Sequence, residues 1–203
     1  MNAESLFNEG YSCYENKEFK KAILHYEKAL ALNPNNCADI LFEIAECKFD
    51  LEEYEESIKY YTKAIETDST APLIYSEEDY YQSRALAYQF LEDYDAAYDD
   101  YSKASEINPH EFSYFENKAH CIYFDELDDS YDLAIKDMDA AIKIRSKNKS
   151  KDDKDYDLFY FRAKLKLINQ EYEDALMDLN KAFEIVKWDP DQLKQKCINA
   201  ISS

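Results

Sequence analysis

Residues 19–34 read FKKAILHYEKALALNP, and this stretch determines the fold class that the sequence predicts. Ala22, Tyr26 and Ala29 are spaced four and then three residues apart, so they lie on one face of a helix. Pro34 ends the segment, because proline cannot continue a helix. The segment therefore predicts a helix with a small–large–small face, which suits close packing against a second helix.

The same pattern returns four more times along the chain. Each copy has two small residues seven positions apart, with a large apolar residue between them and an aromatic residue three positions before the first. The first small residues are Ala22, Ser57, Ala97, Ala134 and Ala175. A second helical segment precedes each copy and is centred on another small residue: Gly10, Ala45, Ala85, Ala119 or Ala163. The sequence therefore predicts five pairs of antiparallel helices.

Composition supports an all-helical chain. The 203 residues include one Gly and four Pro, too few for the turns of β-sandwiches and barrels or for glycine-dependent phosphate loops. Hydrophobic residues make up 46% of the chain, too many for a disordered acidic polymer.

The repeat resembles the tetratricopeptide repeat family, whose 34-residue unit has the pattern W-x2-L-G-x2-Y, then A-x3-F, A and P. The first copy matches best, through Gly10, Phe19, Ala22, Tyr26 and Ala29. The resemblance implies a right-handed α-solenoid of helix–turn–helix repeats with a C-terminal capping helix. We predict repeats at 3–36, 38–71, 78–111, 112–146 and 156–187, a charged linker at 147–155 and the capping helix at 189–203.

The repeat spacing also locates insertions. One lies at residues 72–77, where Ser76 is predicted to cap the next helix with Asp79 as its capping-box partner. We expect further insertions at 125–130 and 145–155, and a helix start at Asp189 and Pro190.

Net charge and cysteine usage restrict the environment and the partners. A formal net charge of -20 repels nucleic acid and anionic membranes, so we expect neither as a partner. Residues 1–10 contain Glu4 and Glu9 and no basic residue, unlike a signal peptide. Five cysteines without a CxxC pair indicate reduced thiols. The chain is therefore predicted to be cytoplasmic.

The residues present predict no catalytic chemistry. None of the motifs G-x-S-x-G, G-x-x-x-x-G-K, G-x-G-x-x-G and H-E-x-x-H occurs. His120 and Cys121 are adjacent on a predicted helix, so their side chains diverge and cannot form a dyad. The acidic clusters at 125–129 and 152–155 lack the glycine and distant Glu of an EF-hand. We expect no enzyme activity, metal or cofactor.

In the family that the chain resembles, the first helix of each pair lines a concave groove that binds peptides. Carrying that face over gives an expected peptide-binding set of Phe7, Tyr11, Tyr14, Asp39, Phe42, Glu46, Phe49, Asp50, Asp79, Gln82, Leu86, Gln89, Glu116, His120, Tyr123, Asp157, Tyr160 and Lys164. Aromatic rings at a concave surface are typical binding anchors. The alternative is that these rings pack against the insertions.

Charge is concentrated in the middle of the chain. Residues 38–71 have a net charge of -7 and residues 72–111 of -8, whereas residues 147–203 are neutral. This distribution would attract a basic or amphipathic peptide, although solubility alone would also explain it. A carboxylate-clamp function is rejected, because Phe7 and Tyr11 stand where clamp members of the family have Lys and Asn.

These observations predict a non-catalytic scaffold or adaptor that binds a peptide segment in an acidic, aromatic groove. Phe42 and Phe49 are the expected anchors. The alternative is a dedicated chaperone for a secreted or aggregation-prone client, although the small acidic chaperones of this family usually have about three repeats.

Overall fold

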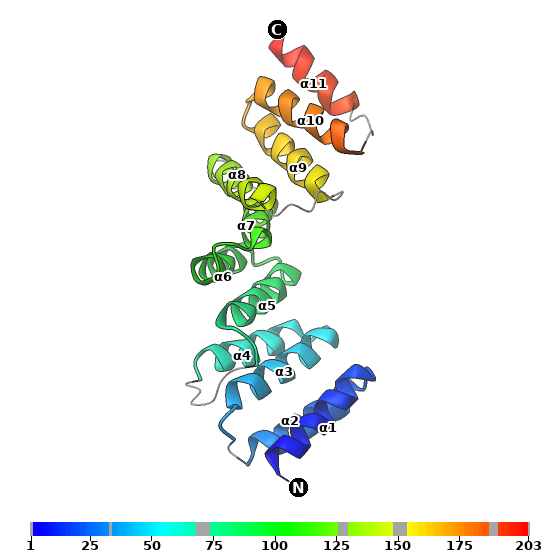
Figure 1. Cartoon of the computed structure of the whole chain (residues 1–203), viewed down its shortest axis with the longest axis vertical. Helices are drawn as coiled ribbons and strands as arrows, with labels where there is room; N and C mark the ends of the chain where they lie inside the picture. Colours follow the sequence, from blue (N-terminus) through cyan, green and yellow to red (C-terminus); the bar gives the residue numbers. More distant parts are fainter. Residues whose placement is uncertain are drawn as a thin grey trace. The chain divides into compact units, whose positions relative to one another are not determined.

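The computed structural model describes residues 2–32, 34–67, 74–125, 130–147, 154–186 and 191–202. The chain forms two compact units, Met1–Ile107 and Asn108–Ser203. In the described residues all regular secondary structure is helical, which confirms the predicted all-α repeat fold (Figure 1). The first unit contains α1 (Ala3–Glu15), α2 (Phe19–Leu30), α3 (Cys37–Asp50), α4 (Tyr54–Ile65), α5 (Glu77–Phe90) and α6 (Tyr94–Ile107). The second contains α7 (Phe112–Phe124), α8 (Tyr131–Lys147), α9 (Lys154–Ile168), α10 (Tyr172–Val186) and α11 (Asp191–Ile201).

The small residues of the repeat are the points of closest helix packing. All of them are buried, and so are the large residues between them, Tyr26, Tyr61, Tyr101, Met138 and Leu179. Within each unit, consecutive helices pack against one another in chain order, α1 to α6 and α7 to α11. This burial is what close packing of small against large residues requires.

Gly10 shows how close this packing is. A Cβ atom at Gly10 would lie 2.6 Å from Cε1 and 2.7 Å from Cδ1 of the Tyr26 ring. Phe7 packs on the same ring, with centroids 5.5 Å apart, and the ring is fully buried. Glycine costs about 1 kcal/mol relative to alanine inside a helix, so its place in the middle of α1 is explained by this contact.

Four of the turns inside helix pairs share one backbone conformation. The left-handed residues are Lys17, Glu52, Glu92 and Gln170, with φ between 59° and 62°. In each turn the next amide donates a hydrogen bond to a carbonyl five residues back, as Glu53 does to Lys48 at 2.9 Å. None of the four is glycine. The low glycine content therefore does not prevent positive φ angles, because the closing hydrogen bonds stabilise these turns.

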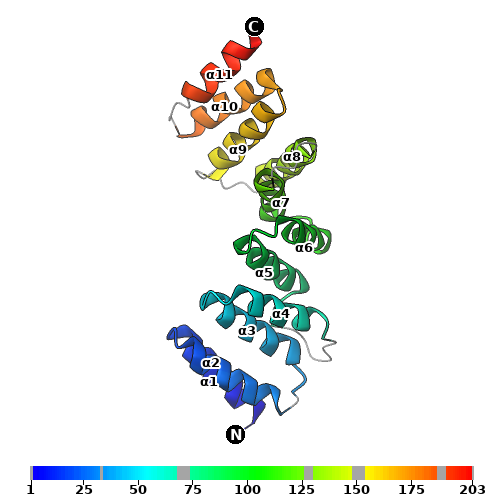
Figure 2. The same cartoon turned by 180° about the vertical axis from the view of Figure 1, so that it is seen from behind.

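The last helix covers α10, as predicted for a capping helix (Figure 2). Cys197 is buried in a cluster with Ala163, Ala175 and Leu179. Ile198 and Ile201 of the same helix are exposed. The packing of α11 therefore uses only part of its apolar surface.

The predicted insertions are described in part. Ser76 and Asp79 form the predicted capping box at the start of α5, with the Ser76 amide and hydroxyl donating to Asp79 Oδ2 at 2.9 and 2.7 Å. Residues 126–129 and 148–153, together with the predicted helix start at Asp189 and Pro190, lie outside the described residues.

Candidate functional site

The two units are considered separately, beginning with α1, α3 and α5 of the first unit. These are the first helices of their pairs, and they carry the expected groove residues. Phe49 of α3 and Phe90 of α5 have ring centroids 5.3 Å apart, and the Glu46 carboxylate interacts with the Ser83 hydroxyl across the same two helices. Asp50 of α3 likewise interacts with the Tyr14 phenol of α1. Tyr14, Glu46, Phe49 and Asp50 are therefore brought together with side chains of neighbouring first helices, and we call this surface the wall.

Part of this wall is covered by the chain itself. Tyr75, which lies in the insertion at residues 72–77, packs on Phe42 with ring centroids 4.5 Å apart. Phe42 also packs on Tyr61 and Tyr80, at 5.6 and 5.0 Å, and is buried. The expectation that Phe42 is an exposed anchor is therefore corrected. At this residue the alternative of packing against an insertion is the one observed.

Asp39 is buried by the same segment. Its Oδ1 atom accepts hydrogen bonds from the amides of Ile74 and Tyr75, at 3.1 and 3.4 Å, and from the Tyr80 hydroxyl at 3.0 Å. A carboxylate with three donors has a structural role, because those bonds offset its desolvation. Asp39 is therefore not available to a ligand, contrary to expectation.

Tyrosine hydroxyls bind two further carboxylates of α3, the buried Glu43 and the half-buried Glu46. Glu43 accepts hydrogen bonds from Tyr26, at 3.0 Å, and from Tyr75. Glu46 accepts one from Tyr61 at 2.6 Å. Burial raises the pKa of both carboxyl groups, and the tyrosine hydrogen bonds oppose that shift only in part.

Other expected groove residues also bind within the protein. Asp79 caps α5, and Gln89 accepts a hydrogen bond from the Tyr101 hydroxyl at 2.8 Å. Gln82 and Phe7 are half-buried, with Phe7 packed on Tyr26. Asp79, Gln89 and Phe7 therefore contribute mainly to the fold.

The remainder of the wall is partly open to solvent. We call it the inner patch and define it by Tyr11, Tyr14, Phe49, Asp50, Tyr54, Leu86 and Phe90. Phe90 stacks on Tyr54 with centroids 4.8 Å apart and planes 12° apart, yet 54% of it is exposed. Tyr11 and Leu86 are 46% and 41% exposed, and Asp50 is exposed. The inner patch thus combines large apolar side chains with an exposed carboxylate that also interacts with the Tyr14 phenol.

The sequence analysis missed Phe90 and Tyr75 as wall residues. Phe90 follows Asp50 by 40 residues, the same interval that separates Ala45 from Ala85, so the repeat spacing contained the signal. Tyr75 lies in an insertion and has no counterpart in the other repeats, so the spacing contained no signal for it.

In the second unit, α7 and α9 bring four of the predicted residues together. His120 stacks on Phe161 with centroids 3.9 Å apart, and Tyr123 meets the same ring edge-on at 5.4 Å. The Lys164 ammonium lies 5.8 Å from the Tyr123 ring and 5.5 Å from the Tyr160 ring. Glu116 is half-buried, and Asp157 is exposed.

Burial, and secondarily Lys164, lowers the pKa of His120 to about 4. His120 is therefore neutral at pH 7, and the positive charge of this cluster comes from Lys164.

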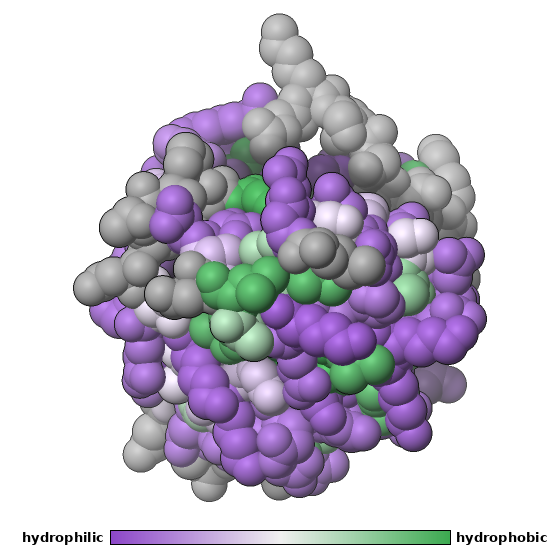
Figure 3. Space-filling model, turned by 90° about the horizontal axis from the view of Figure 1, so that it is seen from below, coloured by the Kyte–Doolittle hydropathy of each residue, from purple (hydrophilic) through white to green (hydrophobic). Residues whose placement is uncertain are grey.

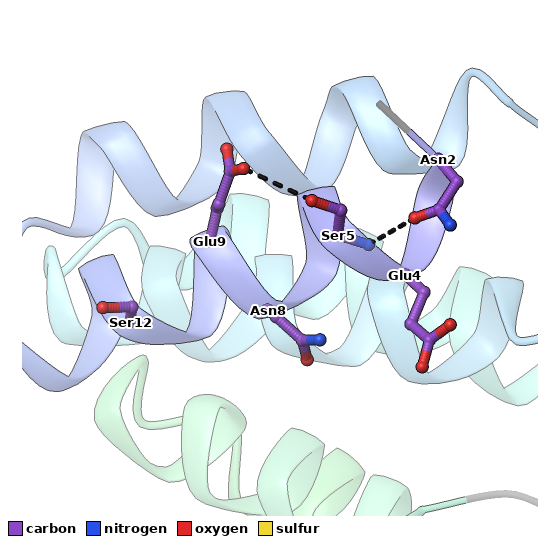
Figure 4. A pocket seen from close by; sticks show the side chains of 6 residues that line it. All are labelled: Asn2, Glu4, Ser5, Asn8, Glu9 and Ser12. Atoms are coloured by element: carbon purple, nitrogen blue, oxygen red, sulfur yellow. Dashed lines mark hydrogen bonds between the residues drawn. The ribbon is translucent and has the colours of Figure 1, made fainter.

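The outer face of α1 offers no comparable site. A shallow hollow there is lined by Asn2, Glu4, Ser5, Asn8, Glu9 and Ser12, all from one helix (Figure 4). Ser5 hydrogen-bonds within the helix, from its amide to Asn2 at 2.8 Å and from its hydroxyl to Glu9 at 3.4 Å. Seen from the end at which Figure 1 places the N-terminus, hydrophilic residues predominate around a small hydrophobic area (Figure 3).

Within the described residues, no three His, Cys, Asp or Glu side chains are grouped so that they could hold a metal ion. No described helix is long and apolar enough to cross a membrane.

The repeat and the helix pairs together define a helical-repeat protein. A family model described as tetratricopeptide repeat matches residues 3–36, and a second model with the same description matches residues 38–70 and 78–111. The chain is therefore a tetratricopeptide repeat protein, as the resemblance indicated. Its fold is that of a protein–protein interaction scaffold.

Comparison with known proteins gives the same fold. YrrB, described as "a TPR protein with an unusual peptide-binding site", superposes with a TM-score of 0.73 at 20% identity, covering 100% of this chain and 93% of that one. A MamA structure gives a TM-score of 0.75 at 18% identity, covering 91% and 92%.

One curated relative is the "DnaJ homolog subfamily C member 3 homolog" of Dictyostelium discoideum. It is 29% identical over 113 residues, which cover 54% of this chain. The match spans 20% of the length of that protein.

Proposed function

We propose that this chain is a non-catalytic scaffold or adaptor whose first unit binds a basic or amphipathic peptide segment on the inner patch. The observation that supports this most strongly is Phe90, which is held by stacking on Tyr54 and packing on Phe49 while 54% of it remains exposed. A ring that is already fixed in place loses little side-chain entropy when it binds a partner. Exposed aromatic residues in such patches are typical anchors of protein interfaces.

The charge of the first unit supports a basic partner. Residues 1–107 contain 24 acidic and 9 basic residues. Asp50 is exposed beside the aromatic rings, so it can pair with a Lys or Arg of the peptide. In this proposal the rings provide the apolar contact, and the carboxylates accelerate association and favour cationic partners.

Fluorescence anisotropy tests the proposal. The probe is a fluorescein-labelled peptide, GKKLFKKLFKKG, compared with one in which each Lys is replaced by Glu and one in which Leu and Phe are replaced by Ser. We expect the first peptide to bind at least tenfold more tightly than either control peptide. We also expect its affinity to fall as salt rises.

Protein variants locate the binding surface. F90A should weaken binding by about tenfold or more, the loss expected for an interface anchor. The matched control is L24A, which removes a side chain of similar exposure, 50%, from α2 in the same unit. It should change affinity by less than about twofold. Equal effects of F90A and L24A would refute the assignment of the inner patch.

The chaperone alternative is favoured by the similarity to a DnaJ homolog. It differs from the adaptor proposal in its effect on unfolded proteins. A chaperone would suppress aggregation of thermally unfolded citrate synthase at substoichiometric concentration, whereas an adaptor would leave that aggregation unchanged. Suppression that is lost in F90A would assign client binding to the inner patch and replace the adaptor proposal.

A further inference from the structure

A separate pocket of about 390 Å³ opens in the second unit, between α7, α9, α10 and α11. Its apolar lining comes from Leu167 and Ile168 of α9 and Leu193 of α11. The burial of Cys197, one helical turn after Leu193, fixes α11 against this part of the unit. The volume falls within the usual range of ligand pockets, roughly 300–1,000 Å³.

Two lysines, Lys164 and Lys196, line the same pocket. Neither forms an ion pair with any described residue. Their neighbour Lys166 differs, because its ammonium lies 2.9 Å from Asp178. No carboxylate is found among the described residues that line the pocket. In a chain with 44 acidic and 24 basic residues, two unneutralised cations in one pocket indicate an anionic ligand.

We propose that this pocket binds an acidic peptide segment in which a carboxylate adjoins a large apolar side chain. The carboxylate pairs with Lys164 and Lys196, and the apolar side chain packs on Leu167, Ile168 and Leu193. Ile168 is 45% exposed and Lys196 is exposed, so the pocket opens at the surface and can accept side chains presented by a peptide. The site is separate from the inner patch and has the opposite charge preference.

The pocket is tested on the full chain with a fluorescein-labelled peptide, GDDLFDDG. In one control peptide every Asp is replaced by Asn. In the other, Leu-Phe is replaced by Ser-Ser. We expect the parent peptide to bind at least tenfold more tightly than both. The variant K164Q/K196Q should lose at least tenfold in affinity. The matched control K136Q/K143Q removes the same charge from exposed positions of α8 in the same unit and should stay within twofold of the unaltered chain.

Three results would overturn the proposal. The first is equal loss in K164Q/K196Q and K136Q/K143Q, which would indicate a general charge effect. The second is displacement of the peptide by phenylacetate at equal concentration, which would identify a free aromatic carboxylate as the ligand. The third is concentration-dependent self-association in sedimentation velocity that K164Q/K196Q abolishes, which would identify a second copy of the chain as the occupant. F90A should leave GDDLFDDG binding unchanged, so failure here and failure of the inner-patch proposal are distinguishable.

Discussion

Replacing Gly10 with alanine tests whether the closest helix contact in the first unit is as tight as the structure indicates. The added Cβ would lie 2.6 Å from the Tyr26 ring, which is fully buried beneath Phe7 and donates a hydrogen bond to Glu43. The ring can yield only by shifting against these neighbours. Overpacking of this kind costs about 1–3 kcal/mol, whereas the alanine gains about 1 kcal/mol of helix propensity. Because the contact is severe, we expect a net loss of about 1–2 kcal/mol.

The contact between Gly10 and Tyr26 differs from the equivalent contacts in the next two helix pairs. Ala45 and Ala85 occupy the equivalent position in the next two pairs. Tyr61 and Tyr101 donate their hydroxyl hydrogen bonds to the first helix of their own pair. Tyr26 instead donates to Glu43 in the following pair. The tyrosine beside Gly10 therefore makes a different connection from its counterparts.

Urea denaturation followed by circular dichroism at 222 nm measures the change in the free energy of unfolding caused by G10A. Repeating G10A in a Y26L background removes the ring that the methyl group would meet. In that background G10A should be neutral or stabilising by about 1 kcal/mol, giving a coupling energy of about 2 kcal/mol. Stabilisation by G10A in the unaltered chain, or the same effect in both backgrounds, would refute the reasoning.

Three further predictions concern buried groups. F42A should destabilise the first unit by about 3–5 kcal/mol in urea denaturation, because Phe42 is packed between Tyr61, Tyr75 and Tyr80. A loss of stability below about 1 kcal/mol would contradict the burial of Phe42. Burial raises the pKa of Glu46, so its stabilising contribution is full below the unfolded pKa near 4.5 and is lost as pH rises through the folded value. E46Q should therefore gain stability relative to the unaltered chain as pH rises above 4.5, and a difference that does not change with pH would count against the shift. D178N should lower the free energy of unfolding of the second unit by about 3–5 kcal/mol, because Asp178 pairs with Arg162 at 2.6 Å and with Lys166 at 2.9 Å. D139N, at an exposed ion pair, should lower it by less than about 1 kcal/mol. Equal losses in the two variants would contradict this.

Much of the fold was predictable because the packing is periodic. Ala22, Tyr26 and Ala29 identify a helix face, and its recurrence in five pairs identifies the architecture. The positive φ at Glu52 and Glu92 was not predictable from glycine content, because backbone hydrogen bonds stabilise these turns.

The site was predictable only where it follows the repeat. Phe49 and Leu86 lie where the spacing placed them, and Phe90 could have been found by the same 40-residue interval. Packing of Phe42 against an insertion was foreseen only as the alternative, and the burial of Asp39 was not foreseen, because the segment at Tyr75 that covers both has no periodicity.

The lysine pocket depends on where the last helix packs. Lys196 follows Leu193 by three residues, so a helical period places them on one side of α11. In the structure this side of α11 meets Lys164 of α9. The sequence pattern alone does not specify how α11 packs, so it did not predict this meeting.

Photo-crosslinking tests the central claim, that the inner patch of the first unit binds a basic peptide, most directly. The peptide GKKLFKKLFKKG is made with benzoylphenylalanine in place of one Phe, irradiated with the full chain, and the crosslinked residues are identified by mass spectrometry. The account predicts crosslinks on α1, α3 and α5 near Tyr11, Phe49 and Phe90, and their loss at high salt. Crosslinks concentrated on α2, α4 and α6, or an unchanged pattern in F90A, would contradict it.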